Sequence, residues 1–548
     1  MATRQSTDLR TLLVGIDAAS LAVLDPLFER DVAPTLRSVF EAGASGALES
    51  QIPPWTASAW PSIYTGMNPG KHGVFDFLRF DGYDWEVVNA SHVRERTLWE
   101  VLDHHGYASV VVNAPVTYPV TPFDGALVPG YMAPEHPTCH PAGILEDVEA
   151  AIGEYRVYPR KPETDGNGSS PDAERYVEAI RSRGAAFRYL ADRFEPDFGF
   201  IQFQVTDTVF HERPNEPALV DAIYGAVDDE LERILDAHDP ANVVVVSDHG
   251  MGPYDGYEFR VNEYLSYHGF VASTKGGRGM PDWSNVRETQ LKRGDERGER
   301  DVGLLERGMA TLGKVGLTGQ RVRTALASVG LEEAVLRHAP ASLVRAARAS
   351  TEQVDFPRSR AYVRSRTELG VRINLAGREP NGVVPPTAYD AVCEELISLL
   401  SGVTTPDGDP VFESVERREA YFDGPVASDA VDIVTIPANF EQFLSAQLAG
   451  STFDEPSEPW NHKRDGVFAA TGDAIDASAS LAGAHLFDVA PTVLATFGIA
   501  PDERMDGTPL PIVERFDERQ YPEPDRGEAV TIDGSAVEAR LADLGYLE

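Results

Sequence analysis

The stretch that decides the fold is Val243–Met251, which reads Val-Val-Val-Val-Ser-Asp-His-Gly-Met. Four β-branched residues in succession predict a fully buried strand, and this strand ends at Asp248 and His249. In open α/β sheets the loops at the carboxyl ends of the strands form the crevice in which ligands bind. Asp248 and His249 are therefore candidate metal ligands.

Two other hydrophobic segments end in the same kind of residue. Residues 12–16 are followed by Asp17, and residues 198–204 lead into Asp207, with His211 four positions further on. Because parallel strands present their carboxyl ends at one edge of a sheet, we expect these side chains to converge on a single site.

Strands and helices alternate around these segments. A core strand is predicted at 108–112, and helices are predicted at 174–194 and 220–235, the latter from apolar residues at three- and four-residue spacing. This βαβ pattern predicts a three-layer α/β/α sandwich with a mainly parallel central sheet. Further predictions are one helix through 22–28 and 36–40, a strand at 370–375, and helices at 389–400 and 486–497.

The chain divides into four parts in this reading. Residues 1–272 and 351–515 form the two parts of the core, 273–350 a helical insert, and 516–548 an acidic tail. The insert carries 14 Lys and Arg against 9 Asp and Glu. Two interpretations are open: a lid that covers an anionic substrate, or arginines that pair with acidic neighbours.

The composition limits the class of protein. The 548 residues include 48 Lys and Arg against 87 Asp and Glu, a formal charge of −39. This charge disfavours a nucleic-acid binder, which needs basic clusters. It is typical of a protein kept soluble in concentrated salt, so we expect the cytoplasm of a halophile.

The two cysteines predict no disulfide framework. With no signal-like start and no run of 18 apolar residues, we expect neither secretion nor a membrane span.

A second informative stretch surrounds Thr56. Prolines place Thr56 at the entry to a short helix that Gly66 closes. One interpretation makes the hydroxyl an ordinary N-cap. In the other, the free N–H groups and positive dipole end of the helix bind a phosphate, with the Thr56 hydroxyl aimed at phosphorus.

Thr56, the pair Thr65-Gly66 and the turn Pro69-Gly70-Lys71-His72-Gly73 resemble the nucleophile segment of the type I phosphodiesterase/nucleotide pyrophosphatase family, within the alkaline phosphatase superfamily. The resemblance spans most of the chain. It also includes the segments 111–119, Asp207 with His211, 247–250, Asn461-His462 and 487–492.

The resemblance implies a two-metal site and a covalent mechanism. One divalent ion would be held by Asp17, Thr56, Asp248 and His249, and the other by Asp207, His211 and His462. Mixed carboxylate and imidazole ligands suit Zn²⁺ or another first-row ion such as Mn²⁺. The implied function is a metal-dependent phosphoester hydrolase that acts through a phosphothreonine intermediate on a small-molecule ester, diesters ahead of monoesters. The alternatives are a phosphotransferase that uses an alcohol as acceptor, and a non-catalytic, metal-stabilised binding protein.

The chain departs from the family at two positions. Ala59 and Phe77 stand where related nucleotide pyrophosphatases have asparagines, one of which holds a phosphate oxygen. The candidates to replace that contact are the backbone N–H groups at the helix start, Ser58 and Ser62. The sulfatase signature Cys-x-Pro-x-Arg is missing, and His72 is expected to be structural.

Overall fold

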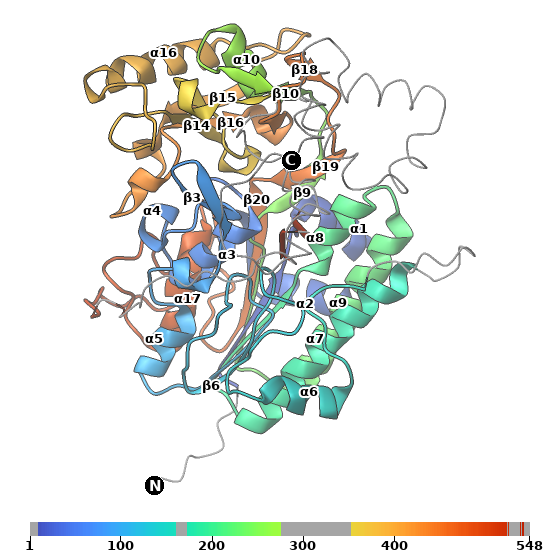
Figure 1. Ribbon diagram of the computed structural model, residues 1–548. Coiled ribbons are helices and arrows are strands. Elements are labelled where there is room, and N and C mark those ends of the chain that lie inside the picture. The colour runs from blue at the N-terminus through green and yellow to red at the C-terminus, as the bar shows by residue number, and fades with distance from the viewer. Residues whose placement is uncertain are drawn as a thin grey trace.

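The computed structural model describes residues 9–160, 172–275 and 352–522, together with 524, 537, 538, 540 and 541. Its centre is a seven-stranded sheet in the order β2-β20-β8-β1-β7-β5-β6 (Figure 1). The strands β8, β1, β7, β5 and β6 are parallel, and β20 and β2 form an antiparallel edge. Their bounds are β1 Thr11–Ile16, β2 Ala44–Glu49, β5 Ser109–Val112, β6 Gly125–Val128, β7 Phe198–Phe203, β8 Asn242–Val246 and β20 Asp465–Gly472.

The central strands are apolar on both faces. In β8, Val244 and Val246 belong to one buried cluster, and Val243 and Val245 belong to another. Successive side chains of a strand point to opposite faces, so these two clusters are the two sides of the sheet. An uninterrupted run of valines is what a parallel strand covered on both faces requires.

Helices cover both faces of the sheet, as Figure 1 shows, so the predicted α/β class with a mainly parallel central sheet is confirmed. One face carries α1 Leu21–Glu29, α2 Pro34–Ala42, α6 Ile144–Ile152, α7 Asp172–Phe194 and α9 Pro217–His238. The other carries α3 Thr56–Thr65, α5 Leu98–His104 and α17 Val489–Thr496.

The prediction of one helix through 22–40 is wrong. The structure has two helices, α1 and α2, separated by residues 30–33. Asp31 adopts a left-handed conformation with φ of 59°, which a continuous helix does not accommodate. Pro34 then occupies the first turn of α2, where its missing N–H costs nothing.

A second body, which we call the cap, consists of residues 258–275 and 352–454. It lies above the carboxyl ends of the central strands (Figure 1). Its four-stranded sheet has the order β13-β14-β16-β15, and its three-stranded sheet has the order β17-β10-β18. The predicted strand at 370–375 is β14 and lies in the cap rather than in the central sheet. The bounds are β10 Glu258–Arg260, α10 Val261–Tyr267, β13 Ala361–Tyr362, β14 Gly370–Ile373, α16 Tyr389–Ser401, β15 Phe412–Arg417, β16 Ile433–Pro437, β17 Phe443–Ser445 and β18 Phe453–Asp454.

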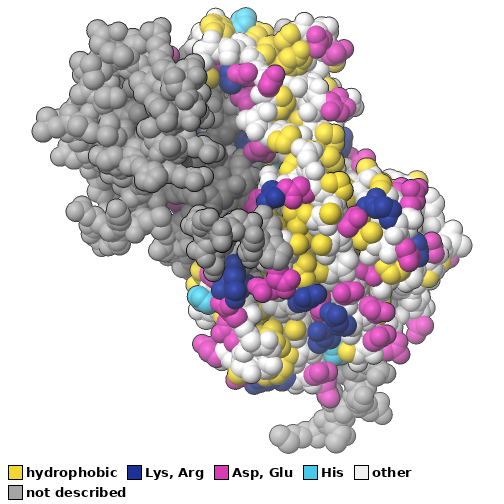
Figure 2. Space-filling model, turned by 90° about the vertical axis from the view of Figure 1, so that its right-hand side faces the viewer, with side chains coloured by type: hydrophobic (Ala, Val, Ile, Leu, Met, Phe, Trp, Pro, Cys, Tyr) yellow, Lys and Arg dark blue, Asp and Glu magenta, His cyan; other side chains and the backbone are white. Residues whose placement is uncertain are grey.

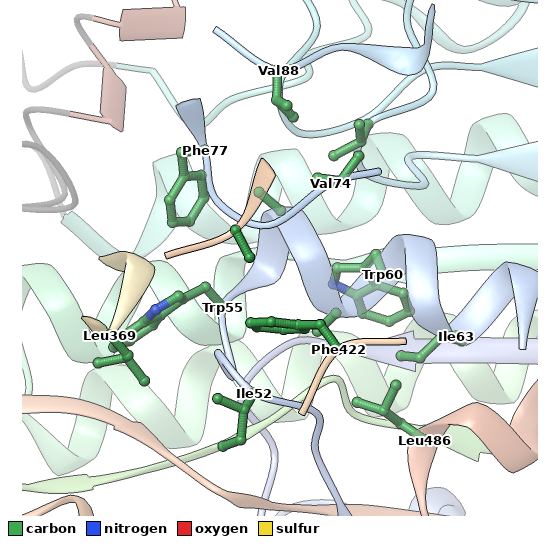
Figure 3. Packing of buried hydrophobic residues seen from close by; sticks show 14 of the residues in the cluster. Ile52, Trp55, Trp60, Ile63, Val74, Phe77, Val88, Leu369, Phe422 and Leu486 are labelled. Carbon is green, nitrogen blue, oxygen red and sulfur yellow. The ribbon is translucent and has the colours of Figure 1, made fainter. Parts of the chain in front are cut away.

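The cap shares its hydrophobic core with the layer around α3. Trp55, just before α3, and Leu369, just before β14, belong to one buried cluster and lie side by side in Figure 3. The chain returns from the cap through β19 Trp460–Lys463, which pairs with β9 Gly250–Pro253 so that His462 lies opposite Met251. This pairing carries His462 back to the end of β8.

Little of the predicted insert falls within the described residues. The strands β11 Ser273–Lys275 and β12 Glu352–Val354 pair in antiparallel fashion, so the segment leaves and rejoins the cap at one place. Residues 276–350 lie outside the described residues, and with them the predicted helical character of the insert and its role as a lid. In the predicted tail, the Tyr521 hydroxyl donates to the carbonyl of Ala500, and Arg540 pairs with Glu212. Within the described ranges no helix is both long and apolar enough to cross a membrane.

Candidate metal centre

Three buried carboxylates meet at the carboxyl ends of neighbouring parallel strands. Asp17 follows β1, Asp248 lies just beyond β8, and Asp207 lies in α8 Val205–Glu212, directly after β7. The register aligns Gly15 of β1 with Gln202 of β7 and Val246 of β8, so the three strands end level with one another. None of the three carboxylates is more than 1% exposed. The sequence predicted this convergence.

The first ligand cluster contains Asp207, His211 and His462. Asp207 and His211 share one face of α8 because they are four residues apart. The Nε2 atoms of His211 and His462 lie 3.2 Å apart, and they lie 3.2 and 3.3 Å from Asp207 Oδ1. Metal–ligand bonds of about 2.0–2.1 Å in a tetrahedron place neighbouring ligand atoms about 3.3 Å apart. The three atoms therefore have the spacing of one face of a tetrahedral coordination shell.

The second cluster surrounds His249. Its Nε2 atom lies 3.2 Å from Asp248 Oδ2, 3.5 Å from Asp17 Oδ1 and 3.3 Å from the Thr56 hydroxyl. The rings of His249 and His462 stack with their centroids 3.5 Å apart, so the two clusters adjoin. The structure thus brings together all seven residues predicted as ligands, from five separate segments of the chain.

The histidines of the stacked pair are held from behind by backbone carbonyls. His462 Nδ1 lies 2.9 Å from the carbonyl of Pro54, and His249 Nδ1 lies 3.0 Å from that of Gly250. A carbonyl only accepts hydrogen bonds, so the proton of each neutral ring is on Nδ1. The lone pair on Nε2 is then directed at the cluster, as in histidines that bind metals.

The carboxylates leave oxygen atoms for a cation. Asp17 Oδ2 accepts hydrogen bonds from Trp60 Nε1 at 3.1 Å and Gln202 Nε2 at 2.6 Å. Asp17 Oδ1 and Asp248 Oδ2 accept none from any residue that the structure describes. Buried oxygens without donors are costly unless a cation neutralises them. These residues therefore fit divalent metal ions.

The charges of the cluster shift several pKa values. Burial, reinforced by Asp248 and Asp207, raises the pKa of Asp17 well above its usual range. Burial alone would raise the pKa of Asp207, but His211 and His462 outweigh it and lower that pKa. Burial and the neighbouring His249 lower the pKa of His462 to about 3. A neutral His462 beside an ionised Asp207 is the protonation state that metal binding requires.

Sequence reasoning missed the residues that position Asp17. Trp60, in α3, donates to Asp17, and its ring packs against Gly15 of β1, which has no side chain to block it. A Cβ on Gly15 would lie 2.4 Å from the Trp60 ring. Gln202 was the available signal, because it is a fully buried polar residue within the apolar strand β7. Buried polar groups need hydrogen-bond partners, and here the partner is a candidate ligand.

Thr56 is the first residue of α3, and Trp55 holds the N-cap position without a side-chain cap. The interpretation of Thr56 as an ordinary N-cap is therefore wrong. Its hydroxyl faces His249 instead, and the side chain is 1% exposed. Gly66 ends the helix with φ of 71°, a left-handed conformation that glycine adopts easily.

The predicted substrate contacts Ser58 and Ser62 make hydrogen bonds within the protein. Ser58 Oγ donates to the carbonyls of Pro53 and Trp55. Ser62 Oγ donates to Gln51 Oε1 and lies 2.8 Å from His72 Nε2. A role for either serine in substrate binding stays a prediction.

Two further positions near α3 are buried. Burial lowers the pKa of His72 to about 3, and this ring accepts a hydrogen bond from the backbone N–H of Val74 in a tight turn. Phe77 packs edge-on against Tyr131, with centroids 6.4 Å apart. The position where related enzymes have an asparagine is thus apolar here.

The comparisons with known proteins identify a family. The model of the type I phosphodiesterase/nucleotide pyrophosphatase family matches residues 11–451. A comparison with curated protein sequences gives no match.

Among solved structures, phosphonoacetate hydrolase from Sinorhizobium meliloti is similar in two complexes. The complex with phosphonoformate is 14% identical and the complex with phosphonoacetate 15%. Both superpose with a TM-score of 0.50 over 89% of this chain and 95% of theirs. At this identity the likeness establishes the fold alone. Human ectonucleotide pyrophosphatase/phosphodiesterase 5 aligns at 11% identity with a TM-score of 0.46, covering 93% of this chain and 97% of its own.

The family match covers most of the chain, and the fold agrees with it. The resemblance noted in the sequence is thereby confirmed. The chain belongs to the type I phosphodiesterase/nucleotide pyrophosphatase family, whose members are phosphoester hydrolases.

Proposed function

We propose that this protein is a metal-dependent phosphoester hydrolase that acts on small-molecule diesters ahead of monoesters, with Thr56 as its nucleophile. The observation that carries the proposal is the position of the Thr56 hydroxyl. It lies at the start of α3, 3.3 Å from His249 Nε2, beside a cluster of three carboxylates. A hydroxyl among candidate ligands at a helix N-terminus is suited to attack phosphorus.

Two divalent ions, Zn²⁺ or a similar first-row ion such as Mn²⁺, fit the two clusters. Asp17, Thr56, Asp248 and His249 would hold one ion, and Asp207, His211 and His462 would hold the other. When bound, two such ions lower the pKa of the attacking hydroxyl and neutralise charge on the attacking and leaving oxygens.

The Thr56 hydroxyl and the backbone N–H groups of α3 take part in the substitution at phosphorus. Thr56 Oγ forms a bond to phosphorus as the bond to the leaving oxygen breaks, which releases an alcohol and leaves a phosphothreonine. Water then attacks phosphorus, the bond to Thr56 Oγ breaks, and the hydroxyl is regenerated. The free N–H groups in the first turn of α3, and the positive end of its dipole, stabilise the phosphoryl oxygens during both steps.

Burial of the centre assists this chemistry. Thr56, His249 and His462 are each at most 1% exposed, so bulk water is kept from the reacting groups. Electrostatic interactions are stronger in such surroundings than in water. Phe77 is apolar where related nucleotide enzymes have a side-chain amide that holds a phosphate oxygen, so the phosphoryl group must be bound by other groups here.

The decisive experiment compares Thr56→Ala and Thr56→Ser with the parent across a panel of phosphodiesters and phosphomonoesters. Thr56→Ala should lose most of its turnover while it remains folded and keeps its metal, and Thr56→Ser should retain turnover. Thr65→Ala is the matched control, because the Thr65 hydroxyl in the same helix donates to the carbonyl of Pro61. Near-normal turnover by a folded, metal-loaded Thr56→Ala protein would exclude the mechanism.

The same intermediate could pass its phosphoryl group to an alcohol. Product analysis with glycerol present separates the two activities, because a phosphotransferase makes glycerol phosphate in proportion to acceptor while a hydrolase makes inorganic phosphate.

We also infer from the charge of −39 that the protein works in a salt-rich cytoplasm.

A further inference from the structure

We propose that Glu458 is a positioning residue for the metal centre, held in place by Arg366 of the cap and acting on His211. This inference rests on the proposed function, because it requires a metal ion at the Asp207 cluster. It adds a residue that is remote in sequence from every candidate ligand except His462.

The contacts form a chain from the cap to the centre. Arg366 Nη2 lies 2.7 Å from Glu458 Oε1. Glu458 Oε2 accepts a hydrogen bond from Asn461 Nδ2 and lies 3.9 Å from His211 Nδ1. The Glu458 side chain is 19% exposed and that of Arg366 6%, so both ends of the pair are largely shielded from solvent.

The three histidines of the centre differ in what lies behind the ring. His249 and His462 each have a backbone carbonyl at Nδ1, whereas His211 faces the carboxylate of Glu458. Metal-binding histidines are commonly oriented by such a group on the second nitrogen, and a carboxylate makes the ring a stronger ligand. At 3.9 Å the Glu458 carboxylate is placed to orient His211 by charge, where the other two rings are oriented by direct hydrogen bonds to backbone carbonyls.

The position of Arg366 makes this contact a link between the two bodies of the protein. Arg366 begins the short 3₁₀ helix Arg366–Glu368 of the cap, and its guanidinium lies 4.5 Å from the centre of the Phe443 ring. Arg366, Trp55 and Asn461 line one small cavity. Trp55 and Asn461 directly precede Thr56 and His462, so this cavity borders the centre.

The alternative is that Arg366 and Glu458 form an ion pair with no influence on the metal. The two accounts differ in two measurable ways. Only the proposal predicts that Glu458 changes the affinity for the ion bound at His211, and only the proposal predicts that the contribution of Arg366 to this affinity depends on Glu458.

The experiment uses the full chain with Glu458→Gln, which removes the charge and keeps the shape. Zn²⁺ affinities are measured by competition with a chromophoric chelator, and unfolding midpoints are measured in excess chelator. The affinity for one of the two ions should fall about 10- to 100-fold, while the midpoint in chelator stays close to that of the parent. Glu258→Gln is the matched control, an arginine-paired glutamate of the cap with no candidate ligand among its described partners, and should leave both affinities unchanged.

Arg366→Gln completes the cycle. It should weaken the same ion in the parent and have no further effect in Glu458→Gln, because its influence passes through that carboxylate. A parent that binds two ions together with a Glu458→Gln protein of unchanged affinities would overturn the inference and leave the proposed function intact. A parent that binds no divalent ion would overturn both.

Discussion

The Nε2 atoms of His211 and His462 lie 3.2 Å apart although 251 positions separate the two residues in the chain. His211 comes from α8 and His462 from β19, which lies beyond the cap. Two imidazole nitrogens facing one carboxylate oxygen at this distance have no strong interaction with one another unless a proton or a metal ion lies between them. This relationship makes metal binding the first property to test.

Removal of single ligands should empty different sites. Asp248→Ala should weaken the ion beside Thr56, and His462→Ala the ion at Asp207, so each variant should bind one ion less tightly than the parent. Chelation should abolish turnover, and a divalent ion should restore it. Elemental analysis after dialysis and a turnover assay check both points. Full turnover in metal-free protein would exclude the two-metal proposal.

Gly15→Ala should destabilise the protein by about 1–3 kcal/mol, the usual cost of overpacking. The new Cβ would lie 2.4 Å from the Trp60 ring, which also donates to Asp17. Displacement of Trp60 should therefore weaken the ion held by Asp17. Gly225→Ala in α9 is the control, because its Cβ meets only a carbonyl at 3.8 Å and alanine favours helix. Denaturant unfolding should show opposite signs for the two variants, and equal effects would contradict this account.

Asp76 should make stability depend on pH. Burial, reinforced by Glu368, raises the pKa of Asp76 to about 7 in the folded protein. An unfolded aspartate titrates near ~3.9, so between these values the folded state keeps a proton that the unfolded state has lost. The free energy of unfolding should accordingly fall as pH rises from about 4 to 7 and level off above that.

The variant Asp76→Asn removes this ionisation. Its Oδ1 atom can still accept from the Thr367 hydroxyl and the N–H of Phe77, as Asp76 does. Its stability relative to the parent should therefore improve steadily across the same pH range, and the exposed substitution Asp81→Asn should show no such trend. Parallel stability profiles of parent and Asp76→Asn would show that Asp76 is not the titrating group.

Salt should stabilise the fold. Figure 2 shows Asp and Glu side chains spread over the described face, in keeping with a formal charge of −39. Screening shortens the range of their repulsion to about 3 Å at 1 M salt. The thermal midpoint should rise clearly from dilute buffer to molar KCl, measured by circular dichroism. A midpoint that stays constant or falls would remove the inference of a salt-rich cytoplasm.

The sequence by itself determined the features that depend on local pattern. Four successive valines specify a strand buried on both faces, and Asp207 and His211 share a helix face through their spacing alone. The wrong prediction of one helix through 22–40 also has a local cause. The apolar residues of both helices suggested a single helix, whereas the chain breaks at Asp31, which adopts a left-handed conformation.

Only the tertiary structure decided which distant residues meet. Glu458 reaches His211 because β19 pairs with β9, and Trp60 reaches Asp17 because Gly15 leaves space beneath β1. The placement of β14 in the cap depends on its antiparallel pairing with β13 and β16. Burial periodicity is a property of neighbouring residues, whereas these contacts arise from the register and packing of separate segments of the chain.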